Sequence, residues 1–394
     1  MGYLRHVPPM GIYETLYAFR DAFGKYMGDP GTHPWSQGFP RTVQLPGGPP
    51  IPTSVGVTSD HLKYPKAWGL PALREAVAAY YRRHYGTDIT SENVMIFAGG
   101  RPAIAAVLLF LEPDVRIRVA STEYTPYFDL LRLLGRSYDA VASGPQNGFA
   151  PPVEEFTRAE PSKRHLVLMS NPCNPTGITR DGADLERIVA AARTGKVGLL
   201  IDEAYELFHE EPVSSLRYVR NIDETDIFVA GAATKGLQAP GIRIGWIVAA
   251  RRNIEILGNF SSFGMGGVSH PSQCFALELL GEERIALARR AVPAFYRGQR
   301  ERYGEAFRRL GLELFTGDGG FYHWCRLPGG MTAGELNRRL FKEGAAILKG
   351  TDCDMLRRGD ASPLAPFFRF SFGPLAPESF ESDIAILRRA FVVQ

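Results

Sequence analysis

One lysine of this chain stands in a setting where its amine could do chemistry. Lys235 follows Thr234 in a turn of small residues, and a Pro-Gly pair at 240–241 and then Arg243 come after it. A lysine amine that has lost its proton can bond to a carbonyl carbon and can later move a proton. The guanidinium of Arg243 offers a rigid fork of donors that suits a phosphate. The segment predicts a nucleophilic lysine beside an anion site, although most lysines of a long chain are solvated surface groups.

Two further segments place polar residues at the ends of apolar runs. The run at 166–169 is followed by Ser-Asn-Pro-Cys-Asn-Pro-Thr-Gly at 170–177, which indicates a loop after a buried strand. The run at 198–201 ends in Asp202, and Tyr205 comes three positions later. A carboxylate at the carboxyl end of a parallel strand lies over the crevice where α/β folds bind ligands. Asp202 could instead be a helix N-cap, and the first loop could be a turn-rich connection.

In this order and spacing, the three segments resemble those of fold-type I aminotransferases of class I and II, which depend on pyridoxal phosphate. The resemblance implies that Lys235 holds the cofactor as a Schiff base and that Arg243 binds its phosphate. It also implies that Asp202 pairs with the pyridine nitrogen and keeps the ring an electron sink. Asn174 and Tyr205 would donate to the ring hydroxyl oxygen.

Other positions match the same family's cofactor site. A strand-like apolar run leads into Gly99, Gly100 and Arg101 and then into a helix. The free N–H groups of a helix start bind anions, and these three residues match the family's phosphate cup. Tyr124 is expected to stack on the cofactor ring, with Tyr127 nearby as a packing residue.

Four residues are expected at the substrate or at the subunit interface. Gly38, in a Gly-Phe-Pro that resembles the family's Gly-x-Pro, would bring its backbone near the substrate carboxylate, and Asn174 would contact the substrate as well. Arg369 lies amid phenylalanines, where an unpaired charge would be costly. The family implies that Arg369 binds the α-carboxylate, and an internal salt bridge is the alternative. Tyr64 would reach the partner subunit's phosphate across a dimer interface, unless it is a core or solvent-side tyrosine.

The resemblance implies an α/β fold with a large domain built on a mainly parallel seven-stranded sheet and a small α+β domain, assembled as a homodimer. We expect residues 1–50 to form an N-terminal arm and part of the small domain. Residues 51–288 would form the large cofactor-binding domain. Residues 289–394, where amphipathic helices and short strands follow one another, would form the small C-terminal domain.

The composition argues against several other classes of protein. The chain has 394 residues, 45% of them hydrophobic, which is enough to bury a large core. Its 45 basic and 42 acidic residues leave a net charge of +3, and no basic tract interleaved with aromatic residues suggests nucleic acid. The four cysteines lack the spacings of a zinc site or a disulfide framework, so we expect no metal and a cytoplasmic location. No apolar run is long enough to span a membrane.

Some positions depart from the common family pattern. Ala232 stands where many members have a phosphate-binding serine, and Thr234 could compensate. Lys349 stands near the substrate mouth where many members have Pro-Gly, although an exposed lysine is the alternative. We expect substrate specificity to reside in the glycine-rich loop at 264–271 and in residues 35–37 of the N-terminal arm.

The leading hypothesis is an aminotransferase that acts on an L-amino acid through the Lys235 Schiff base and a quinonoid intermediate, and passes the amino group to a keto acid. The same early steps serve lyases, replacement enzymes and cyclising enzymes of specialised biosynthesis, for example on S-adenosylmethionine, and the motifs do not separate these fates. A pyridoxal phosphate-sensing transcriptional regulator would need a DNA-reading helical domain, and none fits before Gly38. The sequence leaves the substrate side chain and the amino acceptor open.

Overall fold

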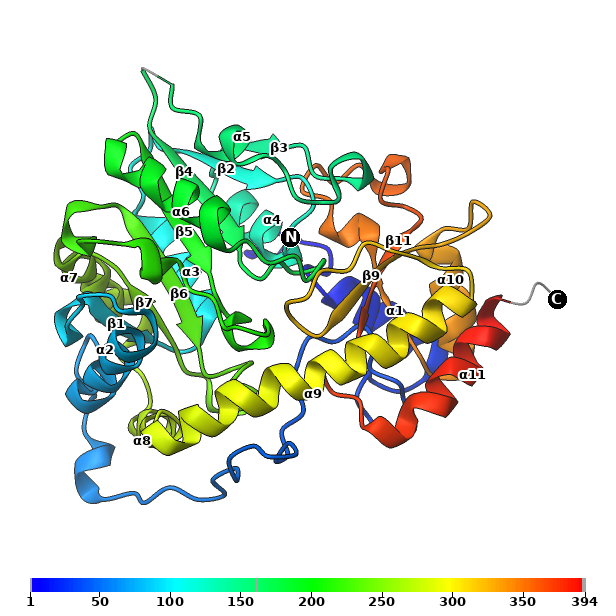
Figure 1. The fold of residues 1–394 in the computed structure, drawn as a ribbon, viewed down its shortest axis with the longest axis horizontal. Coiled ribbons are helices and arrows are strands. Elements are labelled where there is room, and N and C mark those ends of the chain that lie inside the picture. The colour runs from blue at the N-terminus through cyan, green and yellow to red at the C-terminus, as the bar shows by residue number, and fades with distance from the viewer. Residues whose placement is uncertain (1, 161, 392–394) are drawn as a thin grey trace.

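The larger of two sheets forms the centre of one lobe (Figure 1). The structure is a computed structural model that describes residues 2–160 and 162–391. Within these residues the larger sheet has seven strands in the order β1-β7-β6-β5-β4-β2-β3. They are β1 (Val94–Phe97), β2 (Arg116–Ala120), β3 (Tyr138–Val141), β4 (His165–Ser170), β5 (Val197–Asp202), β6 (Ile227–Ala232) and β7 (Gly245–Val248). Among these described strands only β7 runs in the opposite direction to the others, which confirms the mainly parallel seven-stranded sheet.

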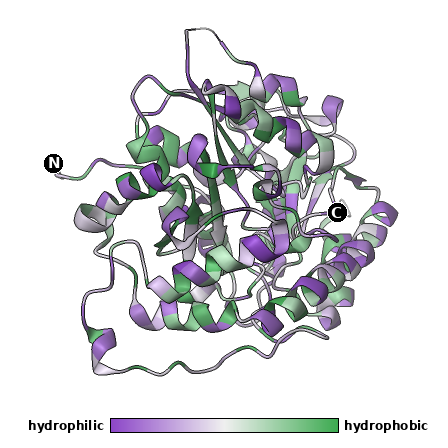
Figure 2. Cartoon of the chain, turned by 60° about the vertical axis from the view of Figure 1, so that its left-hand side comes forward, coloured by the Kyte–Doolittle hydropathy of each residue, from purple (hydrophilic) through white to green (hydrophobic). Residues whose placement is uncertain are grey.

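Alternate residues of the strands face two separate apolar cores, because successive side chains of a strand point to opposite faces. In β4, Val167 and Met169 belong to one core, whereas Leu166 and Leu168 belong to the other. The strands are apolar along their length because helices cover both faces of the sheet. The helices of this lobe are α2 (Pro71–Tyr85), α3 (Gly100–Phe110), α4 (Thr125–Leu133), α5 (Val153–Thr157), α6 (Gly182–Ala191), α7 (Arg251–Phe260) and α8 (His270–Leu279). Figure 2 shows the apolar strands beneath helices that also carry hydrophilic residues.

Helix α2 illustrates how the local sequence sets the limits of an element. Pro71 occupies its first turn, where a missing N–H group costs no hydrogen bond. Leu73, Val77 and Tyr81 recur at helical spacing and are buried in the core beside β1. Gly86 ends the helix in the left-handed region, at a φ of 68°, which glycine adopts without strain. The helix therefore covers β1, the strand that leads into Gly99.

The second sheet has four antiparallel strands in the described part of the chain, in the order β10-β11-β9-β8. Its strands are β8 (Glu313–Leu314), β9 (Tyr322–Arg326), β10 (Leu348–Lys349) and β11 (Phe367–Ser371), and its helices are α1 (Tyr13–Phe23), α10 (Ala333–Leu340) and α11 (Phe380–Phe391). Aromatic residues such as Tyr303, Phe307 and Phe370 fill its core. The long helix α9 (Glu282–Arg309) runs from beside α8 to this sheet and joins the two lobes (Figure 1).

The domain limits expected from the sequence agree with where the sheets lie, and they stay a prediction. The large sheet falls within residues 51–288 and the small one within 289–394. In the N-terminal part, Phe19 of α1 packs with Ala346 of the small lobe. The expected domains include residues 1, 161 and 392–394, which lie outside the described residues. No helix of the described residues combines the length and the apolar character that a membrane span requires.

Candidate active site

A cavity of about 390 Å³ lies where three neighbouring strands of the large sheet end. Asp202 is the last residue of β5, Lys235 comes shortly after β6, and Asn174 comes shortly after β4. The carboxyl ends of parallel strands form the ligand crevice of α/β folds. The expected site residues that line this cavity are Gly38, Gly100, Arg101, Tyr124, Asn174, Asp202, Tyr205, Thr234, Lys235 and Arg243. The fold therefore brings together residues from segments far apart in the sequence.

The amine of Lys235 lies inside this cavity, enclosed by polar and aromatic groups. Its Nζ donates a hydrogen bond to the carbonyl oxygen of Gly38 and lies 5.6 Å from the centre of the Tyr205 ring. Burial, together with the positive charges of Arg101 and Arg369, lowers the pKa of Lys235 to about 7 against the opposing effect of Asp202. A substantial share of the amine is therefore neutral near pH 7, the form in which an amine acts as a nucleophile.

Asp202 is held by two hydrogen bonds at the end of β5. The backbone N–H of Ala204 donates to its Oδ1 at 3.1 Å, and the hydroxyl of Tyr127 donates to its Oδ2 at 3.2 Å. Burial raises the pKa of Asp202, while these two hydrogen bonds and the charge of Lys235 act in the opposite direction. Tyr127, expected only to pack, thus also orients this carboxylate. Tyr127 comes three positions after Tyr124, in the first turn of α4. This spacing is the signal that sequence reasoning did not use.

The start of α3 and Arg243 form a candidate anion site. Gly99 has a φ of 107° and a Cβ there would collide with the Arg243 guanidinium, so the two groups lie in direct contact. Similarly, a Cβ on Gly245 would collide with the backbone of Gly100. Arg243 itself is in the left-handed region, at a φ of 56°, and donates to the carbonyl of Pro240 at 2.9 Å. The free N–H groups of the helix start and the guanidinium together suit a phosphate.

The phosphate-cup contact expected of Arg101 is made by its backbone and stays a prediction, while its side chain holds Tyr124. Its Nε donates to the hydroxyl of Tyr124 at 2.8 Å, and its guanidinium carbon lies 5.7 Å from the centre of that ring. Tyr124 is thereby held over the cavity that it lines. Its expected stacking on a cofactor ring stays a prediction.

Arg369, on β11, is a buried cation beside Asn174, a residue of the cavity wall, and has no carboxylate partner among the described residues. It is 3% exposed, and it donates to the Oδ1 of Asn174 at 2.7 Å and to the carbonyl of Ser36 at 2.8 Å. Its Nε has no hydrogen-bond partner within the described chain. The internal salt bridge, which was the alternative for Arg369, is therefore not found among the described residues. A buried charge in this state is costly until an anion reaches it.

Gly38 and Tyr205 line the cavity, and Tyr322 lies beside both. A Cβ on Gly38 would stand 2.6 Å from the hydroxyl of Tyr322, so no larger residue fits. The hydroxyls of Tyr205 and Tyr322 share a hydrogen bond, and the Arg369 guanidinium carbon lies 4.1 Å from the centre of the Tyr322 ring. Sequence reasoning missed Tyr322, because an aromatic strand of the small lobe carries no local mark of a site.

A buried carboxylate beneath the 170–177 loop was also missed. Glu123 accepts hydrogen bonds of 2.6 Å from both the backbone N–H and the hydroxyl of Ser170, and that hydroxyl accepts from the backbone N–H of Asn174. Burial raises the pKa of Glu123 to about 7, and the hydrogen bonds from Ser170 and Cys173 oppose the rise. The network positions the loop that carries Asn174.

Other expected residues do not reach this cavity in the described chain. The side chain of Tyr64 is 93% exposed, which excludes the core-tyrosine alternative and leaves its contact with a partner subunit a prediction. Residues 264–271 and 35–37 do not line it. Instead, Gly267 packs against Pro65, and the indole of Trp35 donates to the small-lobe residue Asp383 at 3.2 Å.

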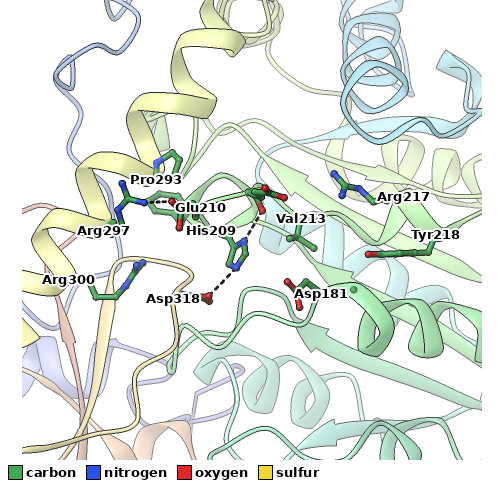
Figure 3. Close-up of a pocket in the computed structure, with 13 residues that line it drawn as sticks. Asp181, His209, Glu210, Val213, Arg217, Tyr218, Pro293, Arg297, Arg300 and Asp318 are labelled. Carbon is green, nitrogen blue, oxygen red and sulfur yellow. Dashed lines mark hydrogen bonds and ion pairs between the residues drawn. The ribbon is translucent and has the colours of Figure 1, made fainter.

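A larger cavity, of about 550 Å³, lies between the two lobes and contains none of the predicted site residues (Figure 3). The imidazole Nε2 of His209 lies 3.0 Å from a carboxylate oxygen of Asp318, and Arg297 pairs with Glu210. The hydrogen bond with Asp318 raises the pKa of His209 to about 9. The described lining residues thus carry as many basic groups as carboxylates, and two of these pairs are in contact.

Comparison with known proteins points to one family. The family model described as aminotransferase class I and II matches residues 51–378. The aspartate/prephenate aminotransferase of Thermus thermophilus is 30% identical over 302 residues, which cover 74% of this chain and 76% of that protein. The valine–pyruvate aminotransferase of Mycobacterium tuberculosis is 29% identical over 329 residues, 80% of each chain. A double mutant of Thermus thermophilus aspartate aminotransferase has a similar fold, with a TM-score of 0.80 at 23% identity over 98% of this chain and 100% of its own.

Proposed function

The chain belongs to the aminotransferase class I and II family and is an aminotransferase, and from this premise we propose that it uses pyridoxal phosphate held by Lys235 to move the amino group of an L-amino acid to a keto acid. The observation that carries the proposal is the buried amine of Lys235 in one cavity with Asp202, Asn174 and Arg243. The lyase, replacement and cyclising alternatives are not favoured, because the matched relatives are named as aminotransferases.

The residues around Lys235 fit the chemical groups of pyridoxal phosphate. Arg243 and the start of α3 offer a cation and free N–H groups to a phosphate, and Gly99 leaves room for close approach. The Asp202 carboxylate would meet the ring nitrogen, and no described lysine, arginine or histidine pairs with it at present. When bound, the cofactor supplies an electron sink that stabilises negative charge at the substrate α-carbon.

Asp202 has a specific electrostatic task in this proposal. Burial raises the pKa of its carboxyl, so the ionised form is costly unless a cation lies against it. A protonated ring nitrogen is such a cation, and the hydrogen bond from Tyr127 fixes the carboxylate that faces it. The pair would hold the proton on the nitrogen. The hydroxyl oxygen of the cofactor ring would accept hydrogen bonds from Tyr205 and from the amide nitrogen of Asn174. The amide nitrogen is the free group, because the Asn174 oxygen already accepts a hydrogen bond from Arg369.

Arg369 and Lys235 would divide the work on the substrate. The Arg369 guanidinium, whose Nε lacks a partner among the described residues, would bind the α-carboxylate and orient the α-carbon toward Lys235. Lys235, with its pKa of about 7, can accept a proton at that carbon and return it at neutral pH. Tyr205 and Phe321, whose rings flank the amine, would limit the access of water.

We propose in addition a cytoplasmic homodimer, in which Tyr64 completes the partner subunit's phosphate site. Exposed apolar side chains support an interface on this side of the molecule, since Leu62, Tyr64 and Phe263 are 82%, 93% and 66% exposed. The four described cysteines are free thiols, as expected in a reducing compartment.

The test is to supply the purified holoenzyme with L-amino acids and a keto acid, and to weigh the products. Amino transfer predicts one new keto acid and one new amino acid in equal amounts, with the donor's side chain intact. A product that has lost or exchanged a side-chain group, without amination of the acceptor, would exclude the proposal and restore the lyase or replacement alternative.

A further inference from the structure

A second cavity, of about 410 Å³, adjoins the first on the side away from the α3 anion site. The two cavities share Lys235, Asn174, Arg101 and other residues, and the second also reaches Arg369. A substrate whose carboxylate binds Arg369 and whose α-carbon faces Lys235 would therefore extend its side chain into this second space.

The walls of the second cavity beyond that inner end are mainly apolar. They come from the N-terminal segment 10–16, from α4 and from β10. The apolar side chains concerned are Met10, Ile12, Leu16, Pro126, Leu130, Leu133 and Leu348. Such a lining rewards the burial of apolar surface and penalises a charge that finds no partner.

The charged groups of this cavity are already engaged or lie at its inner end. Among the described lining residues the only acid is Asp129, whose Oδ2 accepts the backbone N–H of Gly11 at 2.7 Å and whose Oδ1 lies 3.7 Å from Arg132. Arg101 lies at the inner end and donates to Tyr124. The outer part therefore offers no free charge that would recognise a polar side chain.

The N-terminal segment is fastened over this cavity by contacts with both lobes. Beyond the hydrogen bond from Gly11 to Asp129, the Thr15 hydroxyl donates to the Oδ2 of Asp352 at 3.3 Å. Lys349 forms an ion pair of 2.6 Å with Glu14 and lies 3.5 Å from the Asp352 carboxylate. The lysine that departs from the family pattern thus serves to hold this segment, and it is not simply an exposed side chain.

We propose that this apolar cavity is the side-chain subsite and that the donor substrate is an L-amino acid with a large aliphatic or aromatic side chain. The inference rests on the proposed function, because that function supplies the carboxylate and amine contacts at Arg369 and Lys235. It assigns residues 10–16 and α4, in place of the 264–271 loop, as the determinants of specificity.

The first arm of the test does not depend on turnover. Calorimetry on the holoenzyme compares 4-methylpentanoate and 3-phenylpropanoate, which carry a carboxylate and an apolar chain without an amine, with propanoate and succinate. We expect the two apolar acids to bind at least about tenfold more tightly than propanoate, and more tightly than succinate. Tighter binding of succinate, or equal binding of all four acids, would overturn the inference.

The second arm measures kcat/KM for L-leucine, L-phenylalanine, L-alanine and L-aspartate with one fixed keto acid. Leu130→Ala should lower the value for leucine roughly tenfold while alanine changes little, because only the longer side chain reaches position 130. Leu356→Ala, at an exposed position outside the cavity, is the matched control and should alter neither value. A preference for aspartate or alanine in the unaltered enzyme would contradict the apolar subsite.

The two arms separate the inference from the function on which it rests. Tight binding of 4-methylpentanoate, weakened by Leu130→Ala, without amino transfer from any amino acid would refute the proposed function and support the subsite. Amino transfer that favours aspartate would support the function and refute the subsite.

Discussion

The cavity between the lobes and the candidate site at the strand ends differ in how their charges are satisfied. Around the cavity between the lobes, carboxylates and basic groups are equal in number among the described lining residues, and His209 and Arg297 each have an acidic partner (Figure 3). Around the two joined cavities at the strand ends, Lys235, Arg101, Arg243 and Arg369 lack carboxylate partners within the described chain. The charges of the lining residues thus balance in the cavity between the lobes, whereas the candidate site carries unmatched positive charge. Unmatched positive charge marks a place suited to an anionic ligand.

The largest effect should follow from removing the amine itself. Lys235→Ala should lower amino transfer by at least about 10³-fold, because a general base contributes roughly 10² to 10⁴ and the covalent bond to the cofactor is lost as well. Turnover of an amino acid with a fixed keto acid measures the loss. Full activity in this variant would refute the assigned mechanism.

A smaller loss of activity should follow from changing Arg369, the proposed substrate-binding cation. Matched variants of Arg369 and Arg297 also test the comparison of the two cavities. Arg369→Lys keeps the charge but removes the planar fork, so kcat/KM should fall about 100-fold, whereas cofactor content should stay the same. Arg297→Lys makes the same change at the cavity between the lobes and should leave kcat/KM unchanged. Equal losses in both variants would show that the distinction between the two cavities has no functional meaning.

The pH dependence of cofactor attachment tests the lowered pKa of Lys235 in the candidate site. Since only the neutral amine reacts, the rate at which pyridoxal phosphate bonds to the apoprotein should rise about tenfold per pH unit below about 7 and level off above it. Stopped-flow absorption across this range gives the midpoint. A midpoint near that of an ordinary lysine, about 10.4, would contradict the lowered pKa of Lys235.

The smallest effect is expected on the free energy of unfolding, from the pair of His209 and Asp318 in the cavity between the lobes. The pKa of His209 is raised to about 9 by Asp318, above its unfolded value of about 6.5, so the pair stabilises the fold fully below pH 6.5 and less as the pH rises through 9. Because Asp318 is 65% exposed, the contribution should stay below about 1 kcal/mol. Denaturant unfolding of His209→Asn and the unaltered protein at about pH 6 and about pH 10 measures the difference. A larger difference at the higher pH would have the wrong sign.

The comparison also explains what the sequence could and could not predict. Lys235, Asp202 and Asn174 were predictable because each follows an apolar strand, and parallel strands bring their carboxyl ends to one edge. The family was predictable from the order and spacing of the motifs, the mainly parallel sheet was what that resemblance implied, and both are confirmed. Each of these features can be recognised from short segments of consecutive residues.

Contacts between segments far apart in the chain could not be predicted from the sequence. Lys349 pairs with Glu14, 335 positions away, and the Tyr322 hydroxyl meets Tyr205 across 117 positions. Nothing in the local sequence of either residue indicates its partner, because the approach is set by how the small lobe and the N-terminal segment pack over the sheet. The apolar cavity over Lys235 is built from such contacts. Neither the glycine-rich loop nor residues 35–37, where sequence reasoning expected specificity, line it, and their role stays a prediction.

The most direct test of the central claim is to locate the bond between the protein and its cofactor. The holoenzyme is reduced with borohydride, digested and mapped by mass spectrometry, with Lys349→Ala as a matched lysine control. The account predicts a pyridoxyl phosphate adduct on the peptide that contains Lys235, at equal yield in the unaltered protein and in the control. An adduct on another lysine, or none on Lys235, would contradict it.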